Sequence, residues 1–324
     1  MKLSVVIPVF NSEKTLERCL NSILNQTYSD WEVIAIDDGS TDESYSILTN
    51  YNLKDQRFKI LKQSNHGPGF TRNKGIEMST GDYIVFVDSD DYIDNVYFEK
   101  VVNEATSNDS DVIFIDVILE DINGGIIRKE IMSKYKNSTK DRIIRHQMTG
   151  KLPWGGCRKV VKTKVIKENN IKYSYDVVGE EALFSFKVIN NAQNISFIED
   201  TCYHYVNYEN SQSTKGGDNP WGHVCKNMKK YLEENNLFEN YKITINSFAY
   251  TACIVSIQRI SELYNFSDAI KLSKKALDEF KVTYSFNIDK ESIDKRAVLM
   301  LPFAKLNMSI MIVITAKIKQ LLKI

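Results

Sequence analysis

The sequence has few of the residues that mark small secreted, metal-clustered or fibrous proteins. It contains five cysteines among 324 residues, and no two of them form a Cys-x-x-Cys pair. A disulfide framework or a zinc site built on cysteine is therefore not expected, and buried reduced thiols are the simpler interpretation. The 14 glycines and 5 prolines are too few for a fibrous or low-complexity chain.

Neither sign of charge is in excess. The 42 Lys and Arg residues balance the 42 Asp and Glu residues, so the formal net charge is zero. This balance argues against a protein that binds nucleic acid across its whole surface, because such a protein is basic. Hydrophobic residues make up 43% of the chain, which suits a packed core and excludes a disordered chain.

Leader-like and long apolar segments are also missing. The N-terminal stretch of residues 1–10 has no small-residue cleavage site, and Asn11-Ser12-Glu13 interrupts it, so it indicates a first buried strand. Near the C-terminus, the uncharged stretch Leu306–Ala316 is shorter than the ~20 residues that a membrane-spanning helix needs. We therefore expect a cytoplasmic location.

Up to about residue 120, short apolar runs alternate with helical patterns. Glu13–Asn25 has helical spacing, and Asn11 or Ser12 is expected to cap that helix. The apolar runs do not alternate strictly with polar residues, which predicts strands covered on both faces. Repeated strand–helix–strand units predict a mostly parallel sheet, and such sheets bind ligands at the carboxyl ends of their strands. The predicted strands are Leu3–Ile7, Trp31–Ile36, Phe58–Leu61, Tyr83–Val87 and Val112–Leu119.

The remaining chain is less regular. Asn123-Gly124-Gly125 predicts the turn of a hairpin, and Lys151–Gly156 predicts a loop that carries Trp154. Thr214–Pro220 marks a boundary, beyond which residues 221–324 show helical patterns. We predict two domains, an α/β domain over residues 1–215 and a helical region over residues 216–324.

Two predicted strands end in clustered carboxylates. Asp37-Asp38-Gly39-Ser40 follows one strand, and Asp88-Ser89-Asp90-Asp91 follows another. One such cluster is equally typical of a turn or a helix cap. Two clusters at the ends of neighbouring buried strands are costly unless a cation or hydrogen-bond donors compensate them. Asp88 and Asp90 suit a hard divalent ion bound alongside a diphosphate.

The segment between the two clusters, Asn65–Gly75, combines glycines with Arg72. The glycines permit tight turns, and Arg72 can pair with an anion through two hydrogen bonds. The segment matches neither the nucleoside-triphosphate phosphate loop nor the Gly-x-Gly-x-x-Gly fingerprint. P-loop hydrolases and dinucleotide oxidoreductases are therefore disfavoured.

Taken in order, five segments resemble the family 2 glycosyltransferases. The resemblance is strongest over residues 1–100 and continues to about residue 215. It implies a GT-A fold, which is a Rossmann-like α/β domain with a mostly parallel central sheet, and here a C-terminal helical region in addition. It also implies inverting, metal-dependent sugar transfer. The segments are Val5–Asn11, Gln26–Tyr28, Trp31–Asp42, Thr71–Gly75 and Gly81–Asp91.

The resemblance implies roles for individual residues near the donor. Asp88 and Asp90 match the Asp-x-Asp pair, with Asp88 near the ribose or sugar and Asp90 on the metal. A Mn²⁺ or Mg²⁺ ion would offset the charge of the diphosphate and stabilise it as a leaving group. The other residues implied to contact the nucleotide are Pro8, Val9, Asp38, Asn65 and Arg72.

Further along, Val178–Phe184 resembles the Gly-Glu-Asp segment that supplies the catalytic base. The resemblance implies that Glu181 is the base and that Glu180 positions substrate. Aspartate is the usual residue, and glutamate adds a methylene, so its backbone must lie further back to keep hydrogen-bond reach. The alternative is a pair of glutamates that only open a helix.

Two aromatic segments are also similar to the family. Tyr203-His204-Tyr205, followed by Ser211-Gln212-Ser213, resembles the Tyr-His-Tyr…Ser-x-Ser segment and implies that His204 contacts the metal or diphosphate. The alternative is a structural histidine. Trp154 falls where relatives place an aromatic residue in an acceptor-side loop, and a core tryptophan is the alternative.

The last part of the chain, residues 295–324, is basic and apolar. It contains no acidic residue. Such a segment can lie in the interface of an anionic membrane. The alternatives are a terminal helix docked on the protein and a homodimer contact. Because many family relatives elongate lipid-linked glycans at the cytoplasmic leaflet, a peripheral position on the inner face of the membrane is favoured. The basic residues are Lys295, Arg296, Lys305, Lys317, Lys319 and Lys323.

Together these observations predict an inverting hexosyl- or N-acetylhexosaminyltransferase. It would move a sugar from a UDP-sugar to a hydroxyl of a glycan or lipid-linked glycan in envelope or capsule synthesis. One rival is a catalytically silent subunit that binds nucleotide-sugar in a glycan-assembly complex, supported by glutamate at position 181. A nucleotidyltransferase is the other rival, although nothing here resembles its Gly-rich activation loop.

Overall fold

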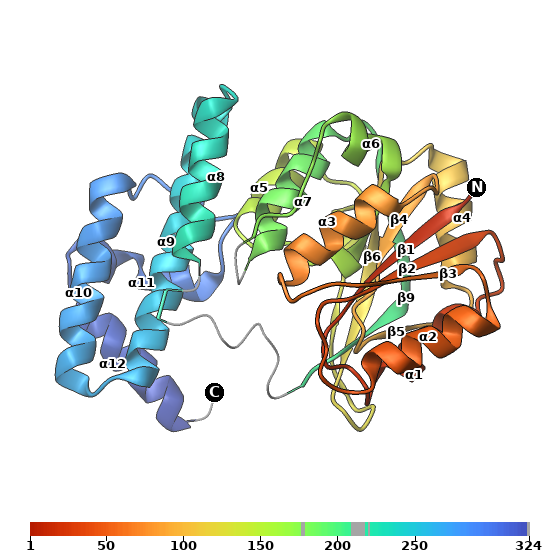
Figure 1. The fold of residues 1–324 in the computed structure, drawn as a ribbon. Helices are drawn as coiled ribbons and strands as arrows, with labels where there is room; N and C mark the ends of the chain where they lie inside the picture. Colours follow the sequence, from red (N-terminus) through yellow and green to blue (C-terminus); the bar gives the residue numbers. More distant parts are fainter. Residues whose placement is uncertain (176–178, 209–217, 220, 323–324) are drawn as a thin grey trace. The chain divides into compact units, whose positions relative to one another are not determined.

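A computed structural model describes residues 1–175, 179–208, 218–219 and 221–322, and it divides into two compact units (Figure 1). The first unit consists of Met1–Lys140, Trp154–Tyr175 and Phe184–Ser211. The second consists of Asp141–Pro153, Asp176–Leu183 and Gln212–Ile324. Residues 214–217 and 220 of the predicted boundary lie outside the described residues.

The first unit contains all the described strands. They are β1 (Leu3–Val9), β2 (Trp31–Asp37), β3 (Phe58–Lys62), β4 (Tyr83–Phe86), β5 (Tyr92–Ile93), β6 (Val112–Glu120), β7 (Ile126–Glu130), β8 (Lys159–Lys162) and β9 (Ile195–Val206). Its helices are α1 (Leu16–Leu24), α2 (Ser44–Lys54), α3 (Pro68–Met78), α4 (Tyr97–Asn108), α6 (Thr163–Glu168), most of α7 (Glu180–Asn191) and the short turns η1 (Ser133–Tyr135) and η2 (Gly156–Arg158). All five strands predicted from the apolar runs are present, as β1, β2, β3, β4 and β6.

The strands form one sheet in the order β3-β2-β1-β4-β8-β6-β9-β5, and β7 pairs with β6. The first four strands of this order are parallel. Beyond them β8 runs antiparallel to both β4 and β6, and β6 pairs in parallel with β9. The predicted parallel core is thus the β3-β2-β1-β4 part, and antiparallel pairs extend it.

Different helices cover the two faces of β1 (Figure 1). Val5 and Ile7 belong to one buried apolar cluster with Leu20 of α1 and residues of α2 and α4. Val6 points to the other face, against α3, where a Cβ added to Gly75 would lie 2.3 Å from Val6 Cγ1. Alternate residues of β1 are therefore buried on opposite faces, as expected for a strand covered on both sides.

The predicted cap of α1 is wrong. The helix begins at Leu16 and follows Thr15, without a side-chain cap. Asn11 instead adopts φ 48° and accepts a hydrogen bond from Thr41 N at 2.9 Å. The Ser12 carbonyl oxygen accepts the Leu16 N–H at 2.9 Å, but the Ser12 hydroxyl is hydrogen-bonded to Phe10 O and Ser89 Oγ instead of a helical N–H. The two side chains that local sequence offered as caps therefore have other partners, in the β2–α2 loop for Asn11 and in the turn after β4 for Ser12.

The predicted hairpin is present between β6 and β7, which pair antiparallel. Gly124 adopts φ +82°, a conformation that glycine tolerates best. Its N–H donates to Asp121 O at 3.0 Å, and Asp121 N–H donates to Gly125 O at 2.9 Å.

All five cysteines of the chain are buried.

The second unit is helical in its described residues, as predicted for the C-terminal region. It contains most of α5 (Lys140–Met148), the first turn of α7, and α8 (Gly222–Glu234), α9 (Phe238–Leu263), α10 (Phe266–Thr283), α11 (Lys295–Lys305) and α12 (Ser309–Leu322). The long helix α9 packs against α8, α10 and α12. Among the helices of the described residues, none combines the length and the apolarity that crossing a membrane requires.

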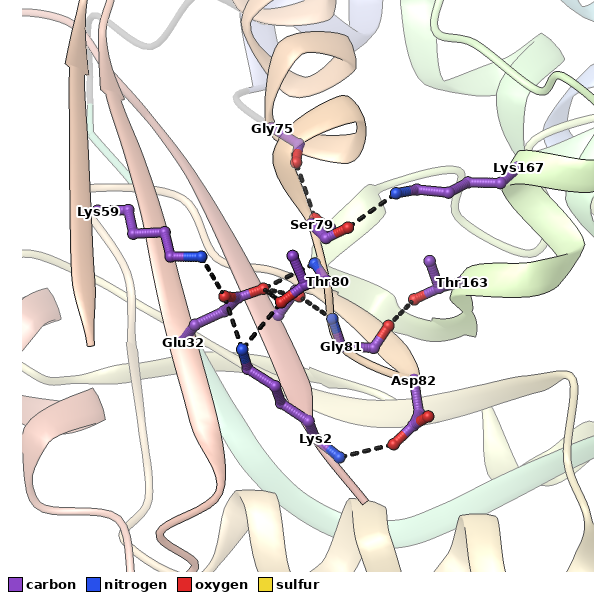
Figure 2. Close-up of polar contacts among 11 residues, drawn as sticks. Lys2, Glu32, Lys59, Gly75, Ser79, Thr80, Gly81, Asp82, Thr163 and Lys167 are labelled. Carbon is purple, nitrogen blue, oxygen red and sulfur yellow. Dashed lines mark hydrogen bonds and ion pairs between the residues drawn. The ribbon is translucent and has the colours of Figure 1, made fainter. Parts of the chain in front are cut away.

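At the amino-terminal edge of the parallel strands, one buried carboxylate joins several elements (Figure 2). Glu32 of β2 is 2% exposed and pairs with Lys2 Nζ at 2.9 Å and Lys59 Nζ at 2.7 Å. Its oxygens also accept hydrogen bonds from Ser4 Oγ at 2.7 Å and Thr80 N at 2.7 Å. Burial alone would raise the pKa of Glu32, but the hydrogen bonds from the lysines, Ser4 and Thr80 outweigh it and hold the pKa well below its usual value.

We predict that Glu32→Gln lowers the free energy of unfolding at pH 7 by about 1–3 kcal/mol. This is less than a fully buried pair would lose, because both lysines keep contact with water. The folded-state pKa lies below the unfolded value of about 4.3, so the contribution of Glu32 is complete above that pH and is lost as the pH falls. The difference between wild type and variant in urea denaturation should therefore shrink at pH 3.

Glu77→Gln is the matched control. Glu77 is more than half exposed and lies 3.8 Å from Lys74 Nζ, so its loss should change the free energy of unfolding by less than about 0.5 kcal/mol. A cost for Glu32→Gln no larger than that of Glu77→Gln, or one that does not shrink at low pH, would show that this carboxylate does not hold the strands.

Candidate functional site

The carboxyl ends of β1, β2 and β4 meet at one edge of the sheet. The parallel register pairs Val9 with Asp37 and Val6 with Phe86. Asp38 N–H then donates to Val9 O at 2.8 Å, which joins the end of β1 to the turn after β2. The residues that the sequence assigned to the donor therefore lie on or just after neighbouring strand ends, where parallel sheets bind ligands. These residues are Pro8, Val9, Asp38, Asp88 and Asp90.

Asp38 holds the loop that precedes α3. Its buried carboxylate accepts hydrogen bonds from Gln63 Nε2 at 2.7 Å, His66 N at 3.0 Å and Gly67 N at 2.8 Å. Asn65 is exposed in the same loop, so the structure brings these two predicted nucleotide contacts together. The nucleotide role of Asp38 stays a prediction, and the geometry adds a loop-holding role that sequence reasoning missed.

Arg72 of α3 pairs with Asp88. Its Nη2 lies 2.8 Å from Asp88 Oδ1, and the guanidinium lies 5.5 Å from the centre of the Tyr173 ring. The next residue, Asn73, exchanges two hydrogen bonds with the backbone of Tyr173. These contacts place a cationic side chain beside a carboxylate at the edge where the strands end, and an arriving diphosphate would compete with that carboxylate for Arg72.

Three carboxylates crowd the turn after β4. Burial, followed by the negative charge of Asp88, raises the pKa of Asp90 to about 6. The same two causes, with the charge of Asp90 in addition, raise the pKa of Asp91 well above its usual value. A divalent cation would relieve this repulsion, and carboxylate oxygens are preferred ligands of Mg²⁺ and Mn²⁺. The donor set of this turn therefore fits the predicted cation.

The ligand atoms of Asp88, Asp91 and Cys157 lie within 4.8 Å of one another, the one such group of metal-binding side chains in the part of the chain that the structure describes. Both oxygens of Asp91 already accept hydrogen bonds, from Tyr203 Oη at 2.7 Å and Val206 N at 2.9 Å. Asp90 is not a member of this group. Asp88 therefore belongs both to the predicted Asp-x-Asp pair and to this group of three side chains. The metal role of Asp90 stays a prediction.

His204 lies in a separate cluster. Its Nδ1 is 2.8 Å from Glu120 Oε1 and its Nε2 is 3.1 Å from Asp94 Oδ1. Its ring stacks on Tyr92 with the ring centres 4.3 Å apart. Both ring nitrogens thus have carboxylate partners, and the structure does not group His204 with Asp88. Its metal role stays a prediction that would require one ring nitrogen to change partner.

Glu180 and Glu181 occupy the first turn of α7, within the second unit. Gly179 before them adopts φ +81°, and a Cβ there would lie 2.7 Å from Val224 Cγ2, so glycine is required at this position. Glu180 is buried. Glutamates at the start of a helix are expected both for a catalytic pair and for a pair that only opens the helix. The base role of Glu181 therefore stays a prediction. Residues 176–178 and 209–217, which include Ser211-Gln212-Ser213, lie outside the described residues.

Trp154, the predicted acceptor-side aromatic, is half-buried. Its carbonyl oxygen accepts hydrogen bonds from Lys159 Nζ at 2.6 Å and Ser185 Oγ at 2.7 Å. These contacts fix the backbone of its loop within the first unit. The role of the indole ring stays a prediction.

Sequence reasoning missed Tyr203. Its hydroxyl accepts a hydrogen bond from Asp88 N at 3.2 Å and donates to Asp91. The only sequence feature that pointed to Tyr203 was its place in the Tyr-His-Tyr segment, in which the resemblance implies a role for His204 alone. Because neighbouring residues of a strand point to opposite faces, the tyrosine and not the histidine is the member of this pair that reaches the acidic turn.

Comparison with known proteins agrees with this geometry. Residues 4–162 match the family model described as Glycosyl transferase family 2. The chain is 29% identical over 329 residues to the poly(ribitol-phosphate) beta-N-acetylglucosaminyltransferase TarP of Staphylococcus aureus, covering 94% of this chain and 98% of that protein. It is 36% identical over 211 residues to the poly(ribitol-phosphate) beta-glucosyltransferase of Bacillus spizizenii, of which it covers 32%.

The fold has a solved counterpart. The crystal structure of residues 1–349 of S. aureus TarS in complex with UDP-GlcNAc superposes with a TM-score of 0.72 at 24% identity. The match covers 99% of this chain and 91% of that one. The predicted α/β fold with C-terminal helices is therefore confirmed. From its sequence segments, its sheet and these relatives, the chain belongs to the family 2 glycosyltransferases and is a glycosyltransferase with the GT-A fold.

Proposed function

We propose that this glycosyltransferase moves a sugar from a UDP-sugar to a hydroxyl of a cell-envelope or capsule glycan, with inversion and with a divalent cation. The observation that carries the proposal is the crowding of Asp88, Asp90 and Asp91 beside Arg72 at the carboxyl edge of the parallel strands. Support for the donor comes from the relatives: TarS was solved with UDP-GlcNAc, and TarP is named for N-acetylglucosaminyl transfer.

In this proposal, residues 1–215 hold the donor. Pro8, Val9, Asp38 and Asn65 contact the base, and Arg72 lies beside the diphosphate. Asp88 binds the ribose or sugar, and Asp90, with His204 as a further contact, binds Mn²⁺ or Mg²⁺. When bound, the cation neutralises the diphosphate and makes it a better leaving group.

The transfer itself needs one proton to move. Glu181 takes the proton from the acceptor hydroxyl as its oxygen attacks the anomeric carbon, and Glu180 helps to hold the acceptor. The new C–O bond forms in line with the bond that breaks, and the electron pair of the broken bond leaves with UDP. Attack from the opposite side inverts the anomeric configuration.

We predict that the purified chain releases UDP when UDP-GlcNAc, UDP-GalNAc, UDP-glucose or UDP-galactose is offered with Mn²⁺ or Mg²⁺. Lipid-linked glycans and poly(ribitol phosphate) are the acceptors to test. EDTA should lower the rate by more than about 10-fold and added Mn²⁺ should restore it. No UDP release with any donor and acceptor would contradict the proposal. Calorimetric donor binding without turnover would favour a silent subunit, and diphosphate release from a nucleoside triphosphate would indicate a nucleotidyltransferase.

The base assignment predicts that Glu181→Gln lowers kcat by about 10²–10⁴-fold, because the variant has no group to accept the proton. Donor affinity, measured by calorimetry, should stay unchanged. Glu180→Gln is the comparison variant and should mainly raise the acceptor KM. Unchanged turnover of Glu181→Gln with intact donor binding would remove Glu181 from the base role.

We also propose that residues 295–324, of which 323–324 with Lys323 lie outside the described residues, place the protein on an anionic membrane surface. Ile312 and Val313 are buried, and α12 packs against α9 and α10, so one face of this segment is docked within the second unit. The segment also exposes apolar side chains, among them Leu306 at 71% and Ile318 at 50%. All charged side chains of the segment are basic, which suits anionic headgroups.

This surface extends to a second part of the unit. Lys317 Nζ donates to Tyr264 O at 3.1 Å, which joins the end of α12 to the corner between α9 and α10. Leu263, Tyr264 and Phe266 are exposed at that corner. Two segments distant in sequence therefore contribute apolar side chains around one contact, and a second copy of the chain is the alternative occupant.

We predict that Leu306→Glu combined with Ile318→Glu weakens binding to vesicles of 30:70 phosphatidylserine and phosphatidylcholine by about 10-fold or more, because both apolar contacts are lost and two negative charges are added. Leu53→Glu is the control, since Leu53 is 74% exposed on α2, outside this surface. Sedimentation with vesicles measures binding. Equal binding by both variants would contradict the membrane proposal, as would a wild-type dimer that the double variant abolishes without any vesicle binding.

A further inference from the structure

Two residues of β9, Tyr203 and Val206, hold the acidic turn after β4. Tyr203 is fully buried, and its hydroxyl accepts the N–H of Asp88 at 3.2 Å and donates to Asp91 Oδ2 at 2.7 Å. Val206, three residues along the same strand, donates its N–H to Asp91 Oδ1 at 2.9 Å. One strand therefore binds both ends of the segment Asp88–Asp91.

The opposite side of the turn is held by α1 and the residues before it. Thr15 Oγ1 donates to Ser89 O at 3.0 Å, and Arg18 Nη2 donates to Asp90 O at 2.7 Å. With these contacts the backbone of the turn is bound from both sides. These contacts engage the backbone of Asp88, Ser89 and Asp90 and do not involve the carboxylates of Asp88 and Asp90.

The three carboxylates of the turn have different tasks in this arrangement. Asp91 is 1% exposed and uses both oxygens to accept hydrogen bonds from β9. Asp88 pairs with Arg72 through Oδ1. Within the described residues, no side chain donates a hydrogen bond to the carboxylate of Asp90. Asp91 is thus an anchor, whereas Asp88 and Asp90 keep oxygens that can turn toward a cation.

We propose that Tyr203 is a positioning residue for the divalent cation: through the Asp88 backbone and the Asp91 carboxylate, its hydroxyl holds the turn in the shape that lets Asp88 and Asp90 bind the ion together. This inference rests on the proposed function. Groups that orient metal-binding side chains typically contribute about 10–100-fold to metal affinity. Removing this hydroxyl leaves the Asp88 N–H and one Asp91 oxygen buried without that partner, which favours a rearranged turn.

The test is Tyr203→Phe, with Mn²⁺ alone as the probe and electron paramagnetic resonance of free Mn²⁺ as the readout. We expect Mn²⁺ binding to weaken by about 10-fold or more. In UDP-release assays the Mn²⁺ concentration for half-maximal rate should rise by a similar factor. The rate at saturating Mn²⁺ should recover to within about 3-fold of wild type, because the reacting groups are unchanged.

Two tyrosines of the same unit serve as controls. Tyr83 is buried and donates to Ser110 O at 2.6 Å, so Tyr83→Phe also removes one buried hydrogen bond of the sheet. Tyr97 is buried with its ring edge-on to Tyr203, at 6.5 Å between ring centres. Tyr83→Phe and Tyr97→Phe should both keep Mn²⁺ affinity within about 2-fold of wild type. Thermal melts of all three variants separate loss of stability from loss of metal binding.

A double-mutant cycle with Asp91→Asn tests the route of the effect. If Tyr203 acts through Asp91, the double variant should bind Mn²⁺ no more weakly than the weaker single variant. Fully additive losses would overturn the inference, as would equal Mn²⁺ affinity in Tyr203→Phe and Tyr83→Phe. In both of those cases UDP release by the wild type would leave the proposed function standing. A wild type that neither binds Mn²⁺ nor releases UDP would instead contradict the proposed function, and the inference with it.

Discussion

β1 is hydrogen-bonded along both of its edges, to β2 on one side and to β4 on the other, and the parallel direction of all three strands places their carboxyl ends together. The turn after β2 and the turn after β4 consequently leave the sheet as neighbours. Every feature of the donor edge depends on this pairing, because Asp38, Asp88 and Arg72 come from segments that share no local contact in the sequence. A shift of one residue in the register of β2 or β4 would turn the strand side chains to the other face and would displace the turns that follow these strands.

The two edges of the same strands use charge in opposite ways. At the amino-terminal edge, the Glu32 carboxylate is buried with two lysines and several hydrogen-bond donors, and its pKa falls (Figure 2). At the carboxyl edge, Asp88 pairs with Arg72, and burial together with the neighbouring carboxylates raises the pKa values of Asp90 and Asp91. A carboxylate that is surrounded by cations and donors stabilises the fold, whereas carboxylates that are crowded together repel one another, and a cation can relieve that repulsion. The net charge of zero is an average over such unlike regions.

The strand β9 shows how neighbouring residues acquire different tasks. Tyr203 faces the acidic turn, while His204 lies between Glu120 and Asp94 on the other face. Both residues belong to one Tyr-His-Tyr segment, so similarity to relatives identifies the segment but not the face on which each residue lies. Because successive side chains of a strand point to opposite faces, Tyr203 and His204 have different neighbours.

The sequence by itself determined the elements and the chemical type of the site. Apolar runs located five strands, Asn123-Gly124-Gly125 located the hairpin, and the ordered motifs identified the family, because these signals are local. It failed at the cap of α1, where the side chains of Asn11 and Ser12 hydrogen-bond with the distant residues Thr41 and Ser89. It also could not reveal the partners of Asp38, Tyr203 and His204. Only the tertiary structure decided these, because each partner is brought within hydrogen-bond distance by pairing between segments that lie tens of residues or more apart.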